Sequence, residues 1–526
     1  MRRSSLWCAV VPVLMAVLVG LSSCKEQRTE PSQGFNAYRL PDKISSGEQH
    51  LYSFKRQYLG LRLSTPGAVT LRAGDQDPVN TIRTAVVLLF TGTGATDTLA
   101  YAEHFSVTDP AQPLLLSAVP ADYSLVVIAN PTAKILTFCN VGAKWSDFNA
   151  PHKLSRNDML STQTAEDGAQ TLLISLSNEQ GPIPVKANQF TAGATERASA
   201  AVTVRLTSQF ARLIVWGTPT LGYNVSKEAS ETGSYVITNY SEYAYLLRHL
   251  GLLKDGTAEA LGDGSDPAER YAVSPYTEEL EQATDETALA TWLSGNRNTY
   301  TSPTPADNPG SLLHTNKIPG TLDGVNLNNV NIYAKETAIP QSRQQQQGLI
   351  TRLVVLYQLY PTSLKAANPT FTAADGWASY HGYYTTGTAL TAYLSAVKAG
   401  RTATVPAGFP ADFASVAGEL ARTASIWNGN TLVSFDLQGV KYYRNSYNYF
   451  MIPCVHFSDV AANAYGHFGV IRNCDYRTQI KAINHFGTPT LDLSALTGSA
   501  LYREAQSTSS ALEVVSPTPF DQEVTL

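Results

Sequence analysis

Strand-length apolar segments, separated by turn residues, recur along most of this 526-residue chain. Clear examples are TAVVLLFT (84–91), YSLVVIAN (123–130) and the period-two segments within 198–218. Gly (36), Pro (28) and Tyr (27) are plentiful, whereas only 15% of the residues are charged, a composition typical of strands and turns. Many short strands with turns between them predict an all-β protein built from β-sandwiches rather than an α/β fold.

The second half of the chain continues this pattern and adds a few helices. We expect further strands at 331–338, 349–361, 441–457 and 467–483. Two short helices are predicted, at 241–253 with Ser241 as N-cap and at 276–293. Gly and Pro cluster near 217–224, which places a domain boundary there.

The N-terminus has the features of an export signal. Arg2 and Arg3 precede an apolar stretch at 6–20, which is too short to span a membrane. The stretch ends in Leu-Ser-Ser-Cys, which resembles the bacterial lipobox, so Cys24 is the predicted site of acylation. Acyl chains on this cysteine would anchor the chain to a membrane without crossing it.

A strand pattern ending in a single arginine follows a polar tether at 25–58. In LGLRLSTPGAVTLRAGD (59–75), Leu59, Leu61 and Leu63 alternate with small or polar residues, and Arg72 is followed by Ala-Gly-Asp. Such small residues favour an exposed, flexible loop, in which a protease could cut. We therefore expect the strand to be temporary, with cleavage between Arg72 and Ala73.

Composition and motifs exclude several classes of function. The net charge is −5 and the pI about 6.0, so nothing indicates a nucleic-acid partner. The chain lacks GxSxG, P-loop, HExxH, CxxC and Rossmann motifs, and we expect neither an enzyme nor a cofactor. Asp375 with His381 is more typical of hydrogen-bonded surface groups than of a hydrolase site.

Cysteine and histidine usage is equally unspecific. Cys139, Cys454 and Cys474 remain once the signal is removed, and an odd number cannot form a complete disulfide framework. A Cys454–Cys474 bridge is possible, but buried free thiols are the preferred interpretation. No metal site is expected from the histidines, which lack ligand spacing.

The C-terminus carries a second strand pattern. In SALEVVSPTPFDQEVTL, apolar residues alternate with polar ones on both sides of a break at Pro517 and Pro519. The apolar positions are Leu512, Val514, Phe520, Val524 and Leu526. This tail is either the last strand of its own domain or a strand that joins another molecule, and the residues leave both readings open.

The motifs together resemble the fimbrillins of Bacteroidales, the subunits of type V pili, and most closely the Mfa-type short-fimbria subunits. The lipobox, the LRAGD site and the terminal strand agree with that family. A segment at 468–489 is similar to the family's near-C-terminal pattern, here Gly469, Val470, Arg472, Asn473, Tyr476, Ile480, Ile483, Gly487 and Pro489. The terminal aromatic is Phe520 where the family pattern has Trp.

The resemblance implies a fold and a maturation route. It implies two tandem transthyretin-like β-sandwich domains with a few short helices in the second. The implied segments are a lipoprotein signal (1–24), a pro-segment (25–72), an N-terminal domain (73–217), a C-terminal domain (218–510) and a donor strand (511–526). It also implies an Arg-specific protease as a partner and an outer-membrane precursor held by lipid on Cys24.

Three functions follow from these observations. The leading one is a structural subunit of surface fimbriae that polymerises head to tail by strand exchange and attaches cells to host or microbial receptors. The second is an accessory or tip subunit whose Tyr-rich loops at 377–384 and 442–449 bind a ligand. The third is a lipid-anchored glycan-binding protein or glycosidase outside any filament.

Overall fold

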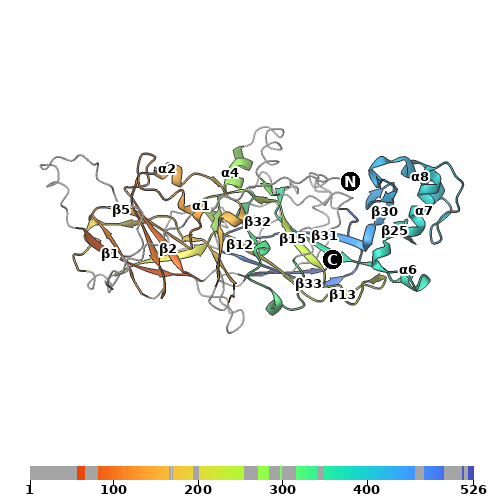
Figure 1. The fold of residues 1–526 in the computed structure, drawn as a ribbon, viewed down its shortest axis with the longest axis horizontal. Helices are drawn as coiled ribbons and strands as arrows, with labels where there is room; N and C mark the ends of the chain where they lie inside the picture. The colour runs from red at the N-terminus through yellow and green to blue at the C-terminus, as the bar shows by residue number, and fades with distance from the viewer. Residues whose placement is uncertain are drawn as a thin grey trace, which may run out of the picture.

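A computed structural model describes most of the chain as an elongated molecule (Figure 1). The described residues are 56–65, 81–109, 112–164, 168, 170–193, 201–253, 270–282, 297–298, 316–339, 349–456, 467–490, 512–514 and 519–525. Strand β1 (Gln57–Ser64) lies at one end of the molecule, and helices α7 (Gly387–Lys398) and α8 (Phe413–Arg422) lie at the other (Figure 1).

The N-terminal region, which we define as residues 56–208, is built on one eight-stranded sheet. Its order is β3 (Leu99–Ser106), β2 (Thr84–Phe90), β5 (Tyr123–Ala129), β9 (Leu176–Asn178), β11 (Val202–Ser208), β1 and β4 (Leu114–Ala118), and β10 (Ile183–Val185) pairs with β5. A hairpin of β7 (Leu160–Thr164) and β8 (Gln170–Ile174) and the short helices α1 (Ala133–Leu136) and α2 (Trp145–Phe148) complete it.

The ends of this sheet approach each other, so it curls around a core. Tyr101 on β3 accepts a hydrogen bond from Val119 N, just after β4, at 3.2 Å. Strand β2 is an apolar run in which every residue after Thr84 is buried. Such a run is expected where both faces of a strand are covered. The curled sheet therefore has the form of a β-sandwich, and β1 is one of its strands, with a neighbour on each side.

The C-terminal region, residues 211–525, contains two larger sheets. One follows the order β21 (Tyr333–Ala334), β12 (Ala211–Trp216), β33 (Asp475–Ile483), β35 (Pro519–Thr525) and β34 (Leu512–Val514), and β13 (Thr220–Leu221) also pairs with β33. The other is β15 (Ser234–Thr238), β23 (Arg352–Gln358) and β31 (Tyr447–Pro453).

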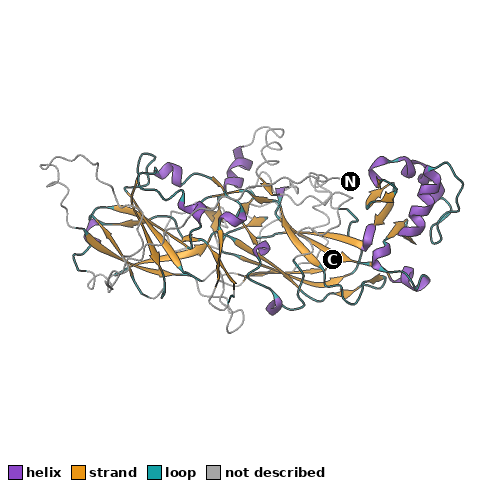
Figure 2. Ribbon diagram, in the orientation of Figure 1, coloured by secondary structure: helices purple, strands orange, loops and turns teal. Residues whose placement is uncertain are grey.

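Two-stranded pairs and helix α4 account for further described parts of this region. The pairs are β14 (Val225–Ser226) with β24 (Tyr360–Pro361), β16 (Tyr240–Ser241) with β20 (Arg297–Asn298), β18 (Leu250–Leu253) with β19 (Arg270–Ala272), and β22 (Thr337–Ala338) with β32 (Gly469–Val470). Helix α4 (Pro275–Gln282) begins where Ser274 Oγ accepts a hydrogen bond from Thr277 N at 3.2 Å. Strands dominate the whole molecule (Figure 2).

A separate lobe, residues 362–446, is inserted between β24 and β31. It contains α6 (Thr362–Ala367), α7, α8, a sheet of β26 (Tyr383–Thr386), β25 (Trp377–Tyr380), β30 (Val440–Tyr443) and β29 (Phe435–Leu437), and the hairpin β27 (Trp427–Asn428) with β28 (Thr431–Leu432). Thr386 caps α7 by accepting from Ala389 N at 3.2 Å. The helices and the sheet share an apolar core of their own, including Leu390, Phe413 and Tyr442.

The expected all-β fold class is confirmed, because strands in sandwich-like sheets dominate the molecule and its helices are few. The predicted strands at 84–91, 123–130, 198–218, 331–338, 349–361, 441–457 and 467–483 all contain observed strands. Helix 276–293 is confirmed over Pro275–Gln282, and residues 283–293 lie outside the described ones. The tandem transthyretin-like arrangement and the domain limits remain predictions.

The predicted helix at 241–253 is wrong. Strands β16, β17 (Tyr243–Ala244) and β18 occupy this segment. Tyr240, Ala244 and Leu247 have the spacing of one helix face, which explains the prediction, but they are buried through strand pairing instead. Pairing of β17 with β6 (His152–Lys153) of the N-terminal region overrides the local preference.

Candidate assembly surfaces

Strand β1 is held between two neighbours in the interior of the N-terminal sheet. It pairs in parallel with β11, where Leu61 faces Val202 and Leu63 faces Val204. On its other side it pairs antiparallel with β4 over five residue pairs, from Gln57–Ala118 to Leu61–Leu114. Both edges of β1 therefore contribute to backbone ladders.

The side chains of β1 follow the alternation read from the sequence. Leu59, Leu61 and Leu63 are buried in the main core, whereas the side chain of Arg62 is exposed. Burying an aliphatic side chain of this size contributes roughly 1.5–3 kcal/mol. The strand is thus part of the folded core rather than an appendage to it.

The sheet depends on β1 at one particular point. Strand β4 is the last in the order and pairs with β1, so removing β1 would free one edge of β4 and one edge of β11 together. The result would be a slot of one strand's width, lined by unpaired N–H and C=O groups and by pockets for three leucines. Backbone N–H and C=O groups that are left without hydrogen-bond partners raise the free energy of the folded chain. They therefore favour the binding of another strand.

A half-buried carboxylate marks the start of β1. Burial raises the pKa of Glu103 on β3, while a hydrogen bond from the backbone of Ser117 on β4 and the nearby Arg56 favour its charged form. Arg56 is itself exposed and directly precedes β1. These groups join the two ends of the sheet at the position where β1 enters.

The C-terminal tail forms two strands on the edge of the other large sheet. Strand β35 runs parallel to β33, with Phe520 opposite Tyr476 and Val524 opposite Ile480. Strand β34 then pairs antiparallel with β35, with Val514 opposite Phe520. Among the described residues, the tail therefore meets the body of the molecule through one ladder, that between β33 and β35.

The structure brings some of the predicted site residues into defined places and leaves others out. Leu512 and Val514 lie on β34, and Phe520 and Val524 lie on β35. The predicted lipidation site Cys24, the cleavage site Arg72–Ala73 and Leu526 lie outside the described residues. The roles assigned to all of these residues remain predictions.

The Tyr-rich segments at 377–384 and 442–449 are largely internal. Trp377 stacks on Tyr443 with their ring centroids 4.0 Å apart, and both are buried. Tyr380 and Tyr442 belong to the core of the lobe. Tyr383 is the exposed large side chain of these segments, at 54% of its full accessibility. The aromatic pattern therefore reflects packing of the lobe more than a ligand surface.

The other singled-out side chains have local structural roles. Asp375 accepts a hydrogen bond from Thr372 N at 2.6 Å, and His381 stacks on Tyr380. Within the described ranges, Cys139, Cys454 and Cys474 are buried free thiols, and burial raises the pKa of Cys139 and of Cys454 to about 12. No cluster of three or more His, Cys, Asp or Glu side chains suited to a metal ion was found among the described residues.

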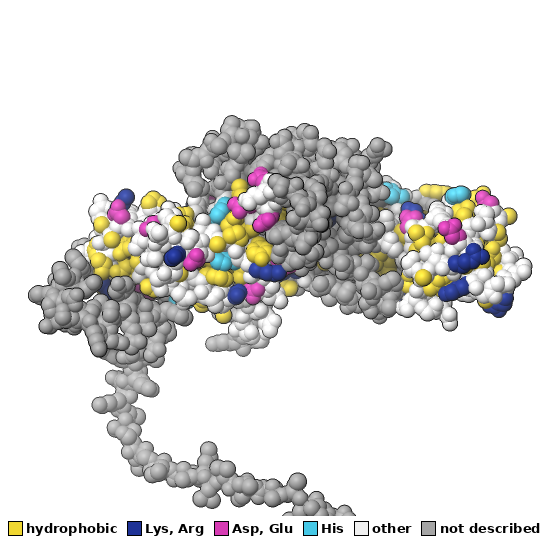
Figure 3. All heavy atoms as spheres, turned by 90° about the horizontal axis from the view of Figure 1, so that it is seen from above, with side chains coloured by type: hydrophobic (Ala, Val, Ile, Leu, Met, Phe, Trp, Pro, Cys, Tyr) yellow, Lys and Arg dark blue, Asp and Glu magenta, His cyan; other side chains and the backbone are white. Residues whose placement is uncertain are grey.

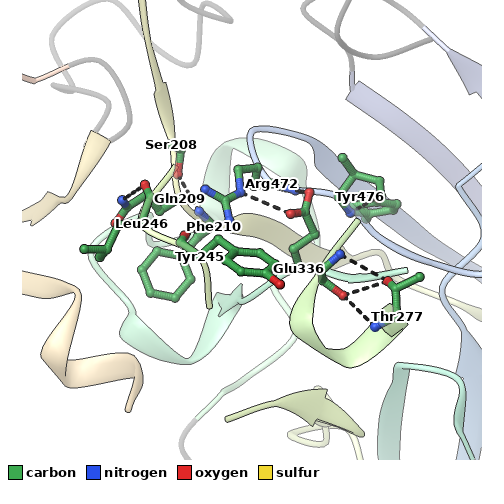
Figure 4. A network of polar contacts seen from close by, with 11 residues as sticks. Ser208, Gln209, Phe210, Tyr245, Leu246, Thr277, Glu336, Arg472 and Tyr476 are labelled. Carbon is green, nitrogen blue, oxygen red and sulfur yellow. Dashed lines mark hydrogen bonds and ion pairs between the residues drawn. The ribbon is translucent and has the colours of Figure 1, made fainter. Parts of the chain in front are cut away.

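The segment Gly469–Tyr476, which resembles the family pattern, lies where the two regions meet (Figure 4). Gly469 has a φ of +135°, and a Cβ there would lie 2.4 Å from the carbonyl oxygen of Thr337. Arg472 and Glu336 form a buried ion pair with Nε and Oε2 3.2 Å apart. The backbone N–H of Ile471 donates to the Tyr476 hydroxyl at 2.8 Å. Asn473 in the same segment accepts a hydrogen bond from Ser208 N at 3.1 Å, and this contact ties the pattern to the end of the N-terminal sheet.

Sequence reasoning missed strand β4 and the lobe. The signal for β4 was the apolar run LLLSA ahead of the VPAD turn. The lobe carries six Lys or Arg and four Asp or Glu, a net charge of +2 in a chain of net charge −5. Lys and Arg side chains gather on the face of the lobe seen in Figure 3. The end of the molecule opposite β1 therefore differs in charge from the rest.

Among the residues that the structure describes, no helix combines the length and the apolar character needed to cross a bilayer.

Comparison with known proteins identifies the C-terminal part of the chain. The family model described as "Major fimbrial subunit protein type IV, Fimbrillin, C-terminal" matches residues 441–511. No curated protein matches the chain. The match includes Gly469–Tyr476, β31 and β33.

Solved structures of fimbrial proteins show distant similarity. A fimbrilin (fimA) from Porphyromonas gingivalis W83 is 10% identical, with 89% of this chain and 97% of that one covered and a TM-score of 0.37. The tip fimbrial protein Mfa3 of Porphyromonas gingivalis, with a C-terminal truncation, is 10% identical, with 58% and 80% covered and a TM-score of 0.24. A fimbrial assembly protein from Parabacteroides distasonis is 13% identical, with 42% and 77% covered and a TM-score of 0.23.

These scores are too low for us to base any conclusion about function on the individual structures. The match to the family model is independent of these structures. It covers residues 441–511, which include the segment at the junction between the two regions and end where the tail begins. Residues 441–511 of this chain therefore match the C-terminal part of the fimbrillins, a family of major fimbrial subunits.

Proposed function

We propose that this fimbrial subunit polymerises by exchanging β1 for the C-terminal tail of a neighbour. The precursor is exported as a lipoprotein anchored through Cys24, and an Arg-specific protease cuts it after Arg72. The mature chain, starting at Ala73, then accepts a neighbour's tail between β11 and β4. Repetition of this contact between unlike surfaces gives an open filament rather than a closed ring.

The observation that carries this proposal is the position of β1. Strand β1 pairs with β4 along residues 57–61 and with β11 along residues 61–64, and with its three buried leucines it blocks the slot as long as it is present. Cleavage beyond it would leave β1 in place only by non-covalent contacts. A longer tail with more buried side chains could then displace it by β-augmentation.

The direction of the strands supports the exchange. Strand β1 is parallel to β11 and antiparallel to β4, and β35 is parallel to β33 and antiparallel to β34. A tail could therefore occupy the slot with the same kind of pairing on each edge that it has in its own molecule.

The spacing of the tail residues also supports it. All five apolar anchors stand at even-numbered positions, so a fully extended tail would present Leu512, Val514, Phe520, Val524 and Leu526 on one face. The odd positions include Glu513, Asp521 and Glu523, which would face solvent. Five anchors would contribute roughly 7–15 kcal/mol before the cost of ordering the strand, with three of them in the pockets of Leu59, Leu61 and Leu63 and the other two buried beyond the span of β1. Three leucines on β1 supply less.

N-terminal sequencing of protein from isolated surface filaments tests maturation. Ala73 is the expected first residue. A surface form that begins at acylated Cys24 and remains monomeric would contradict the proposal.

A cross-linking experiment tests the exchange itself. Thr203 on β11 is exposed and pairs with Arg62 of β1. Chains carrying Thr203→Cys together with Asp521→Cys, Glu523→Cys or Thr525→Cys should give ladders of disulfide-linked chains in filaments for at least one pairing. The same pairs in a chain with Arg72→Gln should give none, because β1 still fills the slot. Equal cross-linking in both backgrounds would exclude the exchange.

A further inference from the structure

The two regions are joined by a very short, buried connection. Strand β11 of the N-terminal sheet ends at Ser208, and β12 of the C-terminal sheet begins at Ala211. Gln209 and Phe210 between them are buried. Connections between domains are usually exposed and flexible, so a buried one indicates that the regions do not move freely.

Side-chain and backbone hydrogen bonds fix this connection from both sides (Figure 4). Gln209 Nε2 donates to the carbonyl of Leu246 at 2.7 Å, and Gln209 N donates to that of Ser175 at 3.2 Å. Asn473 Oδ1 accepts from Ser208 N at 3.1 Å, and Asn473 N donates to the carbonyl of Phe210 at 2.7 Å. Asn473 therefore bridges the end of β11 and the residue before β12.

Buried ion pairs support the residues on either side of Asn473. Arg472 pairs with Glu336 and also donates from Nη2 to the carbonyl of Tyr245 at 3.0 Å. The carboxylate of Asp475 accepts two hydrogen bonds from Arg212, from Nε at 2.6 Å and from Nη2 at 2.5 Å. Removing one partner of such a buried pair is strongly destabilising, so these groups hold the segment in one position. We call Gln209, Arg472, Asn473 and their partners the clamp.

The clamp lies on a continuous line of strands through the molecule. The slot strand pairs with β11, β11 continues into β12, and β12 pairs in parallel with β33 over five residue pairs from Arg212–Asp475 to Trp216–Gln479. Strand β33 then leads toward the tail along the chain. Two steps of this line are hydrogen-bonded ladders, between the slot strand and β11 and between β12 and β33. The other steps follow the covalent backbone. The line's one change of sheet is at Gln209 and Phe210.

We propose that the clamp has a mechanical function: it keeps the two regions together while tension passes from the strand accepted at β11 to the tail donated beyond β33. This inference rests on the proposed strand exchange. A subunit pulled at both ends would tend to open at the change of sheet, and the clamp closes that point. A ladder pulled along its strands resists because its hydrogen bonds share the load.

Other contacts across the two regions assist the clamp. Leu154 N donates to the carbonyl of Glu242 at 3.0 Å, and Arg156 donates to Asn331 Oδ1 at 3.0 Å and to the hydroxyl of Tyr240 at 2.9 Å. These contacts lie away from the line of strands. They limit rotation of the regions, whereas the clamp holds the point at which tension crosses.

Single-molecule pulling of the precursor tests the clamp without any filament. Handles attached at Ala95 in the N-terminal region and at Asn430 in the lobe, both exposed, load the junction but neither β1 nor the tail. The wild-type chain should extend only when one of its regions unfolds. A chain with Asn473→Gly and Gln209→Met should show a short extension step first, as the regions separate while still folded.

The variant is chosen so that it folds. Glycine tolerates the φ of +63° at residue 473, and neither change leaves a buried charge. It leaves Ser208 N and the Leu246 carbonyl without their partners, and opening lets water reach them. At constant force we expect opening to be faster by about tenfold or more, which corresponds to roughly 1.4 kcal/mol from lost hydrogen bonds.

Leu88→Ala in the core of the N-terminal region is the matched control, because it weakens that region without touching the clamp. It should lower the unfolding force and give no early step. An early step in the control, or its absence in the clamp variant, would overturn the inference. Loss of exchange in the cross-linking experiment, with this pulling result intact, would overturn the proposed function and the route of tension that depends on it, but not the finding that the clamp holds the two regions together.

Discussion

Strands β1 and β35 are paired in the same way but differ in how much of the molecule depends on them. Each runs parallel to one neighbour and antiparallel to another. The antiparallel neighbour of β1 is β4, which belongs to the body of the sheet, whereas that of β35 is β34, which belongs to the same tail. Withdrawal of β1 breaks two ladders with the body, and withdrawal of the tail breaks one.

In the proposed exchange, this difference would separate a strand whose release requires cleavage from one that leaves without it. The tail can detach as a unit, exposing one edge of β33. Strand β1 cannot detach without opening a sheet in its interior. The comparison explains why a protease would be needed at the N-terminus and not at the C-terminus.

The largest expected effect comes from removing the tail. Deletion of residues 511–526 should abolish polymerisation and leave a folded monomer, because the slot would have no strand to accept. Electron microscopy of cell-surface filaments and circular dichroism of the purified chain measure the two results. A control with Glu513→Gln and Glu523→Gln alters the two odd-numbered positions expected to face solvent, and it should polymerise. Filaments built by the deleted chain would show that the tail is not the donor, and mere incorporation of that chain at a filament end would indicate a tip subunit.

Blocking the predicted cleavage should act nearly as strongly from the other end. Arg72→Gln should leave β1 covalently attached, so the chain should accumulate as a lipid-anchored monomer. Membrane fractionation and gel electrophoresis of unboiled samples measure this. Arg62→Gln is the matched control and should mature normally. Arg62 lies within β1, where its backbone pairs with β11, so we do not expect the protease to cut there. Normal maturation of the Arg72→Gln chain would place the cut elsewhere.

A smaller effect is expected from side chains of β1 in the precursor. Leu61→Ala should lower the free energy of unfolding by about 2–5 kcal/mol, because Leu61 is buried between β11 and β4. Arg62→Ala on the neighbouring position should cost about 0.5 kcal/mol or less, since its side chain is exposed. Chemical denaturation measures both, and equal costs would contradict the burial of β1.

The last effect depends on pH and concerns the contact between the two regions at Lys335, whose ammonium donates to the carbonyl of Leu154. Burial lowers the pKa of Lys335 from 10.5 to about 7. Between those pH values the unfolded chain binds the extra proton, so this group makes stability rise with pH, by at most about 1.4 kcal/mol per unit. Below pH 7 its contribution is constant and least favourable.

The variant Lys335→Met should lose this part of the pH dependence. Denaturation of both proteins from pH 6 to 10 measures the difference, which cancels the titration of all other groups. If the difference in the free energy of unfolding between the two proteins stays constant across this range, burial does not lower the pKa of Lys335.

Much of the first region could be predicted from the sequence because its signals are local. The alternation of Leu59, Leu61 and Leu63 gave the strand and its buried face, and the apolar run at 84–91 gave a strand covered on both faces. In the lobe, α8 carries a local signal that was missed, because its buried residues Phe413, Ala417, Leu420 and Ala421 stand at helical spacing. The sequence pattern does not say what this apolar face packs against, and only the tertiary structure places it against the sheet of β25 and β30.

The same distinction between local pattern and tertiary structure applies to the candidate assembly surfaces. Periodicity determines which residues of the tail can share one face, because side chains alternate along any extended strand. It cannot determine which sheet a strand joins, because one pattern suits every edge with matching pockets. Only the tertiary structure decided that β1 lies between β11 and β4, that the tail lies on β33, and that Asn473 meets Ser208 across the junction. Those contacts join residues far apart in the chain, and their specificity comes from the shape and hydrogen-bonding groups that folding brings together.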